Sequence, residues 1–101
     1  MSGSQPVRVL FVCLGNICRS PTAEAVFSHK AGQAGWSGLL AADSAGTAAW
    51  HVGKAPDSRT QQHARQRGYD LSGLRARQIS AADFETFDHI LAMDADNLAE
   101  L

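Results

Sequence analysis

One apolar run near the start of the chain, Val7–Val12, constrains the fold more than any other feature. β-Branched and aromatic residues at this density are typical of a strand covered on both faces, as in a parallel sheet. The run breaks at Gly15, and a helical pattern follows over residues 22–34, with Ser20 as the expected N-cap and Pro21 in the first turn. A buried strand that passes directly into a helix predicts a βαβ connection.

The rest of the chain continues this alternation without an internal repeat or a linker. Two further strands are expected in GLLAADSAG and FDHILAM, which are residues 38–46 and 87–93. Helical patterns cover residues 57–67, residues 80–87 and the segment after Asp94, with caps expected at Asp57, at Ser80 with Asp83, and at Asp94. The sequence therefore predicts a single α/β domain over residues 1–101, built on a parallel sheet.

Composition and charge restrict the partners. A formal net charge of −1 and a pI near 6.4 give no overall field that would hold nucleic acid or an anionic membrane. No apolar run is long enough for a membrane span, so we expect a cytoplasmic protein without nucleic-acid or membrane partners. The two cysteines, Cys13 and Cys18, lie on one short loop and cannot join distant segments, which indicates a reducing compartment.

The turn between the first strand and the first helix has the properties of an anion site, because ligands of open α/β sheets bind at the carboxyl ends of the strands. Gly15 and Asn16 tolerate a positive φ, and Arg19 adds a planar fork that fits two phosphate oxygens. Cys13 lies at the base of this turn, where dipole, amides and guanidinium favour the thiolate over the thiol. The amides expected to bind phosphate are those of Leu14, Gly15, Asn16, Ile17, Cys18 and Arg19. An ionised sulfur below a phosphate site is a nucleophile for phosphorus.

Several other interpretations of these residues are weaker. The two cysteines could be small buried side chains, but the loop around them favours chemistry. A zinc site needs four ligands, and no histidine lies near either cysteine in the sequence. A nucleotide-binding P-loop would end in Gly-Lys-Ser/Thr, which is absent. The histidines, His29, His51, His63 and His89, are scattered and interpreted as structural or solvated, and Arg59, Arg65 and Arg67 as a solvated helix face. We therefore expect no metal and no cofactor.

The motif VLFVCLGNICRSP resembles the signature loop of the low-molecular-weight protein tyrosine phosphatases, and the resemblance extends from about Val7 to Leu101 through AEAVF, DSAGT, WHVGKAPDSR, RQIS and MDADN. It implies a flavodoxin-like parallel sheet with helices on both faces, here without the last strand and helix. It also implies hydrolysis of phosphotyrosine proteins or small aryl phosphates through a phosphocysteine, with inorganic phosphate as the product.

The resemblance further implies a role for each matching residue. Cys13 would be the nucleophile, Arg19 the phosphate clamp and Ser20 a hydroxyl donor to the thiolate. Asn16 and Ser44 would hold the loop, although Ser44 could also be an ordinary strand-end residue. Trp50 would form an aromatic wall beside the substrate rather than part of the core. Cys18 would protect the nucleophile by trapping its sulfenic acid as a reversible disulfide.

The sequence departs from the family pattern in two respects. The family's general acid lies in an Asp-Pro motif after the third strand, and the 101 residues contain no Asp-Pro pair. We therefore expect attack on activated aryl phosphates but impaired turnover of phosphotyrosine. Leu74 occupies a position where many bacterial relatives carry a histidine that braces the loop asparagine. An uncovered edge of the third strand would favour self-association. The alternatives are a weakly catalytic phosphate- or phosphotyrosine-binding module and, less favoured for want of further cysteines, a thioredoxin-coupled arsenate reductase.

Overall fold

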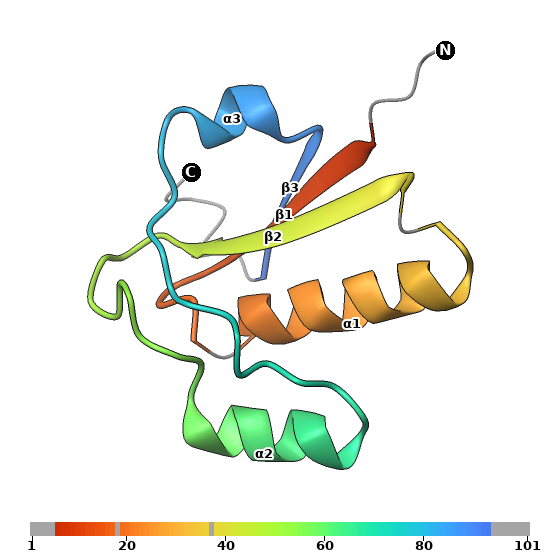
Figure 1. Ribbon diagram of the computed structural model, residues 1–101. Helices are drawn as coiled ribbons and strands as arrows, with labels where there is room; N and C mark the ends of the chain where they lie inside the picture. Colours follow the sequence, from red (N-terminus) through yellow and green to blue (C-terminus); the bar gives the residue numbers. More distant parts are fainter. Residues whose placement is uncertain (1–5, 18, 37, 94–101) are drawn as a thin grey trace.

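The sheet confirms the parallel α/β architecture expected from the sequence. The computed structural model describes residues 6–17, 19–36 and 38–93. Within these residues three parallel strands, β1 (Val7–Cys13), β2 (Leu40–Gly46) and β3 (His89–Ala92), are arranged in the order β2-β1-β3 (Figure 1). The central position of β1 explains its unbroken apolar run, because neighbours flank it on both edges and residues 9–13 are all buried.

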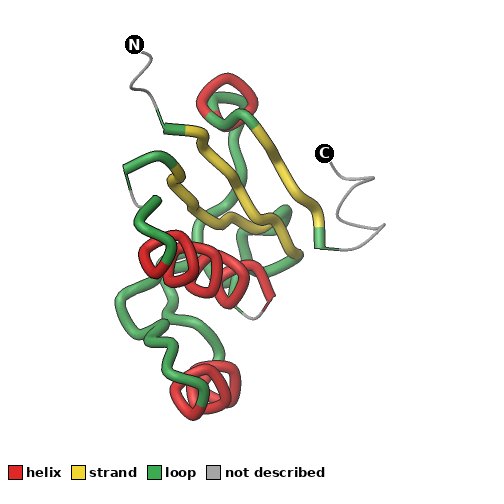
Figure 2. The backbone as a smooth tube through the Cα atoms, turned by 90° about the vertical axis from the view of Figure 1, so that its right-hand side faces the viewer, coloured by secondary structure: helices red, strands yellow, loops and turns green. Residues whose placement is uncertain are grey.

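Helices and irregular segments cover both faces of the sheet. Helix α1 (Arg19–Gln33) packs on one face, where the rings of Phe11 and Phe27 meet edge to face at 5.7 Å. The opposite face of the sheet carries the buried cluster Leu10, Val12 and Ala45, packed against Ile79, Phe87 and Ile90. Figure 2 shows α1 and the short helix α3 (Asp83–Thr86) on opposite sides of the sheet. This confirms the expected two-sided arrangement.

The boundaries of α1 correct one expectation. The helix begins at Arg19 rather than near Thr22, so Ser20 is its second residue and not its N-cap. The capping rule places a hydroxyl outside the helix, where it accepts a backbone N–H. Here the Ser20 side chain is fully buried and contacts the side chains of Cys13 and Asn16 instead. Its hydroxyl therefore belongs to the loop rather than to the helix end.

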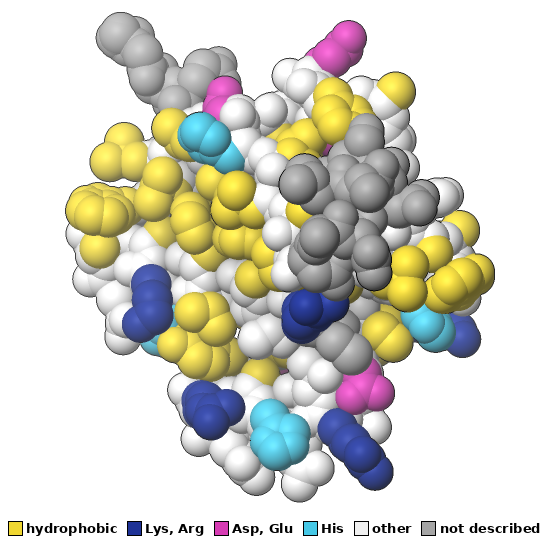
Figure 3. Space-filling view, turned by 180° about the vertical axis from the view of Figure 1, so that it is seen from behind, with side chains coloured by type: hydrophobic (Ala, Val, Ile, Leu, Met, Phe, Trp, Pro, Cys, Tyr) yellow, Lys and Arg dark blue, Asp and Glu magenta, His cyan; other side chains and the backbone are white. Residues whose placement is uncertain are grey.

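The second crossover contains α2 (Ser58–Gln66), whose predicted cap is confirmed. Asp57 is the N-cap, and its Oδ2 accepts the N–H of Thr60 at 3.1 Å. The three arginines interpreted as a solvated face, Arg59, Arg65 and Arg67, are all exposed. Figure 3 shows Lys, Arg and His side chains gathered at the lower end of the molecule, where α2 lies.

The last elements are shorter than expected. The helix expected over residues 80–87 is a single turn with Ala82 at the N-cap position, although the predicted partners Ser80 and Asp83 do meet: the N–H of Ser80 donates to Asp83 Oδ2 at 2.8 Å. The third strand has four residues instead of seven. The helix expected after Asp94 lies outside the described residues. No helix in the described ranges is long and apolar enough to cross a membrane.

Candidate active site

Cys13 is the last residue of β1 and the first element of the site. Its backbone is paired with Gly46 of β2, and its carbonyl accepts the N–H of Thr47 at 3.0 Å. The side chain is buried, with 5% exposure, and its Sγ lies 2.9 Å from Ser20 Oγ in the first turn of α1. A hydroxyl that donates to a sulfur stabilises the ionised form of that sulfur. The structure therefore brings Cys13 and Ser20 into contact, and their roles as nucleophile and hydroxyl donor remain predictions.

Asn16 orients this hydroxyl. Its Nδ2 donates to Ser20 Oγ at 2.9 Å, so the Ser20 hydroxyl proton is available to be donated to Cys13 Sγ. The Asn16 side chain is 2% exposed, and its backbone takes a left-handed conformation with φ 57°. Asparagine is among the residues that tolerate this region best. Asn16 therefore has the loop-supporting position that the resemblance implied.

Gly15 is required for a different reason from the one expected. Its φ lies outside the left-handed region, and Asn16 alone among the described non-glycine residues has a positive φ. A Cβ on Gly15 would lie only 2.8 Å from Cδ2 of His51. The glycine therefore gives space to a histidine of the following loop. His51 was expected to be structural or solvated, and it packs against Gly15 in the loop that follows Cys13.

The carbonyls of the loop are bonded to the segment after β2. The carbonyl of Leu14 accepts the N–H of Ala48 at 2.9 Å, and that of Ile17 accepts the N–H of Asp57 at 2.7 Å. These bonds attach the loop to residues 47–57 over most of its length. Arg19 is exposed as the first residue of α1, at the helix end that favours anions. Cys18 lies outside the described residues.

Ser44 joins β2 to α1, because its hydroxyl donates to Glu24 Oε1 of α1 at 2.6 Å. A role of Ser44 in holding the loop remains a prediction. Trp50 is 70% exposed in the loop after β2, which agrees with an exposed residue and excludes a core position. Its contact with a substrate remains a prediction.

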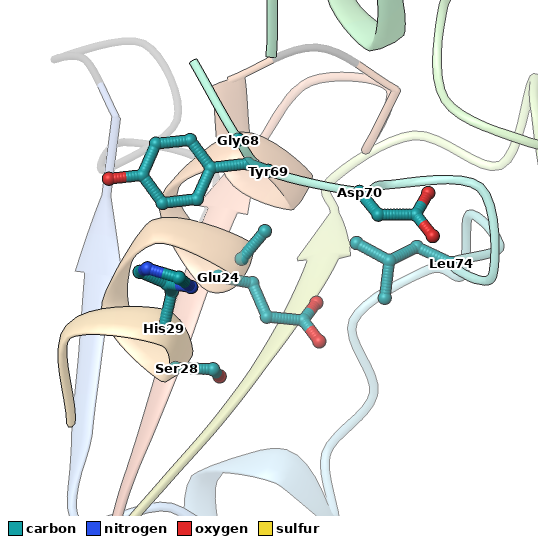
Figure 4. Close-up of a pocket in the computed structure, with 8 residues that line it drawn as sticks. Glu24, Ser28, His29, Gly68, Tyr69, Asp70 and Leu74 are labelled. Atoms are coloured by element: carbon teal, nitrogen blue, oxygen red, sulfur yellow. The ribbon is translucent and has the colours of Figure 1, made fainter. Parts of the chain in front are cut away.

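Glu24 lies between Ser44 and a pocket of about 280 Å³, which Figure 4 shows with the side chains of Tyr69, Asp70 and Leu74 around it. Burial raises the pKa of the Glu24 carboxyl above its ordinary value, and the Ser44 hydrogen bond acts in the opposite direction. Leu74, where the family resemblance led us to expect a histidine, lines this pocket. The brace of the loop asparagine comes from elsewhere: the backbone N–H of Arg77 donates to Asn16 Oδ1 at 2.9 Å.

Sequence reasoning assigned no role to two residues of the site, Gly46 and Arg77. A Cβ on Gly46 would lie 2.7 Å from the carbonyl oxygen of Leu14, so the loop rests directly on the end of β2. The position of Gly46 at the end of a parallel strand was a usable signal, because strand ends meet at one edge of the sheet. Arg77 acts through its backbone amide, 61 residues from Asn16, which no local pattern reveals.

The described residues hold no group of three or more His, Cys, Asp or Glu side chains placed to bind a metal ion. The groups that the site brings together are one sulfur, one hydroxyl and a helix N-terminus. This set suits a nucleophile that attacks an anionic, tetrahedral group.

Comparison with known proteins agrees with this chemistry. Residues 8–101 match the family model described as low molecular weight phosphotyrosine protein phosphatase. The low molecular weight protein-tyrosine-phosphatase YfkJ of Bacillus subtilis is 50% identical over 95 residues, which are 94% of this chain and 61% of that protein. The human low molecular weight phosphotyrosine protein phosphatase is 50% identical over 93 residues, which are 92% of this chain and 58% of that protein.

Solved structures give the same result. The crystal structure of YfkJ superposes with a TM-score of 0.93, covering 95% of this chain and 60% of that one. The crystal structure of DARP, a Drosophila arginine phosphatase, has a TM-score of 0.86 at 46% identity, covering 91% of this chain and 57% of that one. The chain thus spans only part of the length of the proteins that it matches. Its fold, its site and 94 matched residues show that it belongs to the low molecular weight phosphotyrosine protein phosphatase family.

Proposed function

We propose that this chain attacks phosphotyrosine and other aryl phosphate monoesters with Cys13 and carries the phosphoryl group as a phosphocysteine. The observation that supports this most directly is the contact of 2.9 Å between Cys13 Sγ and Ser20 Oγ at the N-terminus of α1. The hydroxyl, the helix dipole and the loop amides all favour a thiolate at this place. Family membership supports the same reaction class.

The reaction has two displacements at phosphorus. In the first, the Cys13 sulfur attacks in line, an S–P bond forms, and the bond to the aryl oxygen breaks with its electron pair leaving on that oxygen. The amides of residues 14–19 and the Arg19 guanidinium hold the three equatorial oxygens, where charge builds in the transition state. In the second, water attacks phosphorus, the S–P bond breaks, and inorganic phosphate leaves. Ser20 then stabilises the returning thiolate.

The leaving oxygen determines which substrates react fastest. The 101 residues contain no Asp-Pro pair to serve as the family's general acid. General acid catalysis is typically worth about 10²–10⁴ in rate, so phosphotyrosine is expected to turn over poorly in this chain. Aryl phosphates with acidic phenols lose least, because their oxygen leaves readily as an anion.

Trp50 is proposed as the wall for the substrate ring. Its exposed indole lies in the loop whose other residues contact the phosphate loop, such as His51 against Gly15. An aromatic side chain in this place favours aryl esters by ring stacking. Because one structural relative is named as an arginine phosphatase, phosphoarginine belongs in the substrate panel as the competing candidate.

A single experiment tests the proposal. The 101-residue chain is mixed with para-nitrophenyl phosphate, quenched with acid and analysed by mass spectrometry for a phosphoryl group on Cys13. We expect the adduct and a burst of nitrophenol in the chain and in the matched Cys18→Ser variant, and neither in Cys13→Ser. A chain that binds phosphate or vanadate reversibly without any adduct would instead be a binding module. Absence of both binding and adduct rejects the site altogether.

The proposal also includes a reducing, cytoplasmic location and a protective role for Cys18. Mild peroxide is expected to convert the nucleophile to a sulfenic acid, which condenses with the Cys18 thiol to a disulfide and releases water. A thiol reductant should then restore alkylation of Cys13. In Cys18→Ser the same treatment should lead to irreversible oxidation, and equal recovery in both proteins contradicts the protective role.

Self-association through the edge of β3 remains a prediction, because this strand pairs on one side with β1 and the described residues place no strand on its other side. Sedimentation velocity tests it: a concentration-dependent increase in sedimentation coefficient supports the prediction, and a monomer at all concentrations removes it.

A further inference from the structure

We propose that Arg77 is a positioning residue for the phosphate loop, held in place by an ionic clamp with Asp43 and Asp83. We call these three residues the Arg77 clamp. The inference rests on the proposed function of Cys13 and adds to it a device that lies outside the signature loop. It rests on two sets of contacts made by Arg77. Its backbone contacts the phosphate loop, and its side chain contacts the two acidic residues.

The backbone of Arg77 lies between the loop and the end of β2. Its N–H donates to Asn16 Oδ1 at 2.9 Å, and its carbonyl accepts the N–H of Gly46 at 2.8 Å. Two residues further on, the N–H of Ile79 donates to the carbonyl of Gly46 at 2.8 Å. Any shift of this segment therefore moves the amide that holds the left-handed Asn16.

The path from this amide to the sulfur is continuous. Asn16 accepts from Arg77 with Oδ1 and donates to Ser20 with Nδ2 at 2.9 Å, and Ser20 Oγ lies 2.9 Å from Cys13 Sγ. The Asn16 and Ser20 side chains are buried, with exposures of 2% and 0%. Water therefore has little access to replace a lost link. A displaced amide would turn the Asn16 side chain and, through it, the hydroxyl that faces the sulfur.

The segment that carries this amide has little regular structure of its own. Residues 70–80 contain one isolated bridge, between Gly46 and Gln78, and no helix or strand. An irregular segment is held less firmly than a ladder or a helix unless side chains tie it down. The side chain of Arg77 supplies such ties, to Asp43 and to Asp83.

The guanidinium binds both acidic residues at once. Its two terminal nitrogens donate to the two carboxylate oxygens of Asp83, each at 3.0 Å, in a bidentate pair. Nε and Nη2 donate to Oδ2 of Asp43 on β2, at 3.3 Å and 3.1 Å. A planar fork with five N–H groups can satisfy this arrangement, whereas a lysine ammonium cannot span it. The clamp thus fixes the segment to β2 and to the first residue of α3.

The electrostatics of the clamp agree with this geometry. The hydrogen bond to Asp83 raises the pKa of Arg77, and the same bond lowers the pKa of Asp83, whose side chain is 9% exposed. Asp83 also accepts the N–H of Ser80 at 2.8 Å, which fixes the carboxylate independently of Arg77. The pair is ionised throughout the neutral range, so the clamp is closed under the conditions in which the thiolate reacts.

The test uses Arg77→Met, Arg77→Lys and Asp83→Asn, all of which keep the backbone N–H at residue 77. Arg75→Met is the matched control, because Arg75 lies on the same segment and donates to the carbonyls of Ser72 and Leu74 rather than to acidic side chains. Two quantities are measured in the 101-residue chain: the burst rate with para-nitrophenyl phosphate, and the pH at which iodoacetamide alkylates half of Cys13.

We expect Arg77→Met to slow the burst roughly tenfold to a hundredfold, since a misplacement of about 1 Å at a reacting group costs rates of this order. The pH midpoint of alkylation should rise, because the hydroxyl no longer faces the sulfur. Arg77→Lys and Asp83→Asn should show smaller changes in the same direction, and Arg75→Met should stay within about twofold of the parent chain. An unchanged alkylation profile in folded Arg77→Met overturns the proposal, since loss of general stability does not shift that profile.

Two further arms keep the result decisive. Where Arg77→Met does not fold, Asp43→Asn replaces it, because the Asp43 side chain is 45% exposed and its loss disturbs the core least. An unchanged alkylation midpoint in Asp43→Asn and Arg77→Lys then rejects the clamp. If Cys13 of the parent chain is alkylated normally but forms no phosphocysteine, the proposed function is rejected. The alkylation midpoints of the variants then test the Arg77 clamp by themselves.

Discussion

Two loops leave the same edge of the sheet and differ in almost every physical property. The loop after β1, residues 14–17, is short and wedged against Gly46, and its Asn16 is 2% exposed. The loop after β2, residues 47–57, is longer and exposes Trp50 and Val52 by 70% and 54%. The first lies beside Cys13, where we propose the chemistry at phosphorus, and the second exposes the apolar side chains that we propose for substrate recognition. The comparison teaches that one edge of a sheet can separate these tasks between neighbouring loops.

The two loops are nevertheless bonded to each other. Backbone hydrogen bonds run from Ala48 to Leu14 and from Asp57 to Ile17, and His51 packs against Gly15. The loop after β2 therefore supports the loop after β1. Substitutions in one loop, followed by measurements of stability, phosphate binding and activity, therefore test whether the two loops have separate tasks.

The largest effect is expected for Gly46→Ala, which places a Cβ 2.7 Å from the carbonyl oxygen of Leu14. Because backbone atoms on both sides would have to move, we expect a loss of several kcal/mol of stability, roughly 3 or more, together with loss of phosphate binding. Gly73→Ala is the control, since a Cβ there meets nothing within 4 Å. Chemical denaturation and phosphate titration measure both changes, and a Gly46→Ala chain that binds phosphate normally would refute the tight contact.

A smaller effect is expected at Asn16. Asn16→Gly keeps the left-handed backbone but removes the bonds to Ser20 and Arg77, which we expect to cost about 1–3 kcal/mol. Asn16→Ala should cost roughly 1 kcal/mol more, because alanine is strained at φ 57°. Both should slow the burst phase. Equal stability of the two variants in urea unfolding would show that the backbone relaxes instead.

The exposed loop should respond in activity and not in stability. Trp50→Ala is expected to lower kcat/KM for aryl phosphates roughly twofold to tenfold, because an aromatic contact contributes roughly 0.5–1.5 kcal/mol. The melting temperature and the affinity for inorganic phosphate should stay unchanged. Trp36→Ala, which removes a 53% exposed indole from the turn after α1, is the matched control. A loss of phosphate affinity in Trp50→Ala would mean that the two tasks are not separate.

Asp57 lies where the exposed loop enters α2. Asp57→Ala removes the acceptor for the N–H of Thr60 and should lower stability by about 1 kcal/mol. The backbone bond from Asp57 to Ile17 survives the substitution, so the burst rate should change little. Glu85→Ala, an exposed position in α3, should change stability by less than about 0.5 kcal/mol. A large fall in burst rate for Asp57→Ala would show that the cap also holds the phosphate loop.

The smallest effect is expected from pH. Arg77 lowers the pKa of Asp83 below its ordinary value of 3.8, so the folded state binds this proton less readily than the unfolded state. The resulting stabilisation is fully present above about pH 3.8 and is lost as the pH falls through the lower folded pKa. Asp83→Asn should flatten this part of the stability curve. If the stability of that variant falls at acidic pH as it does in the parent chain, the Arg77–Asp83 pair is not the cause of this pH dependence.

The sequence was sufficient for the first βα unit because its signals are local. The apolar run predicts a strand covered on both faces, and the turn residues Gly15 and Asn16 indicate an anion site directly before a helix. The local rules erred where tertiary contacts took over. Ser20 is of a residue type that favours N-cap positions, but its burial beside Cys13 gives its hydroxyl another partner.

Arg77 shows why the remainder of the site was not predicted. Its contribution to the loop comes from a backbone amide that any residue would carry, and its side chain pairs with Asp43, 34 positions earlier. Neither relation leaves a periodic or spaced pattern in the sequence. Ser44 is a different case, since its bond to Glu24 joins β2 to α1, and the loop-holding role that the family resemblance implies for it stays a prediction.

The pairing of β1 with β2 extends to the last residue of each strand, Cys13 opposite Gly46, so the proposed nucleophile belongs to the sheet and not to the loop after β2 that we propose for substrate recognition. Amide hydrogen exchange at Thr47, whose N–H donates to Cys13, should therefore be among the slowest at this edge. Proteolytic cleavage of the exposed stretch around Val52 would therefore be expected to lower the specificity between phosphate esters. It should leave Cys13 in its place at the end of β1.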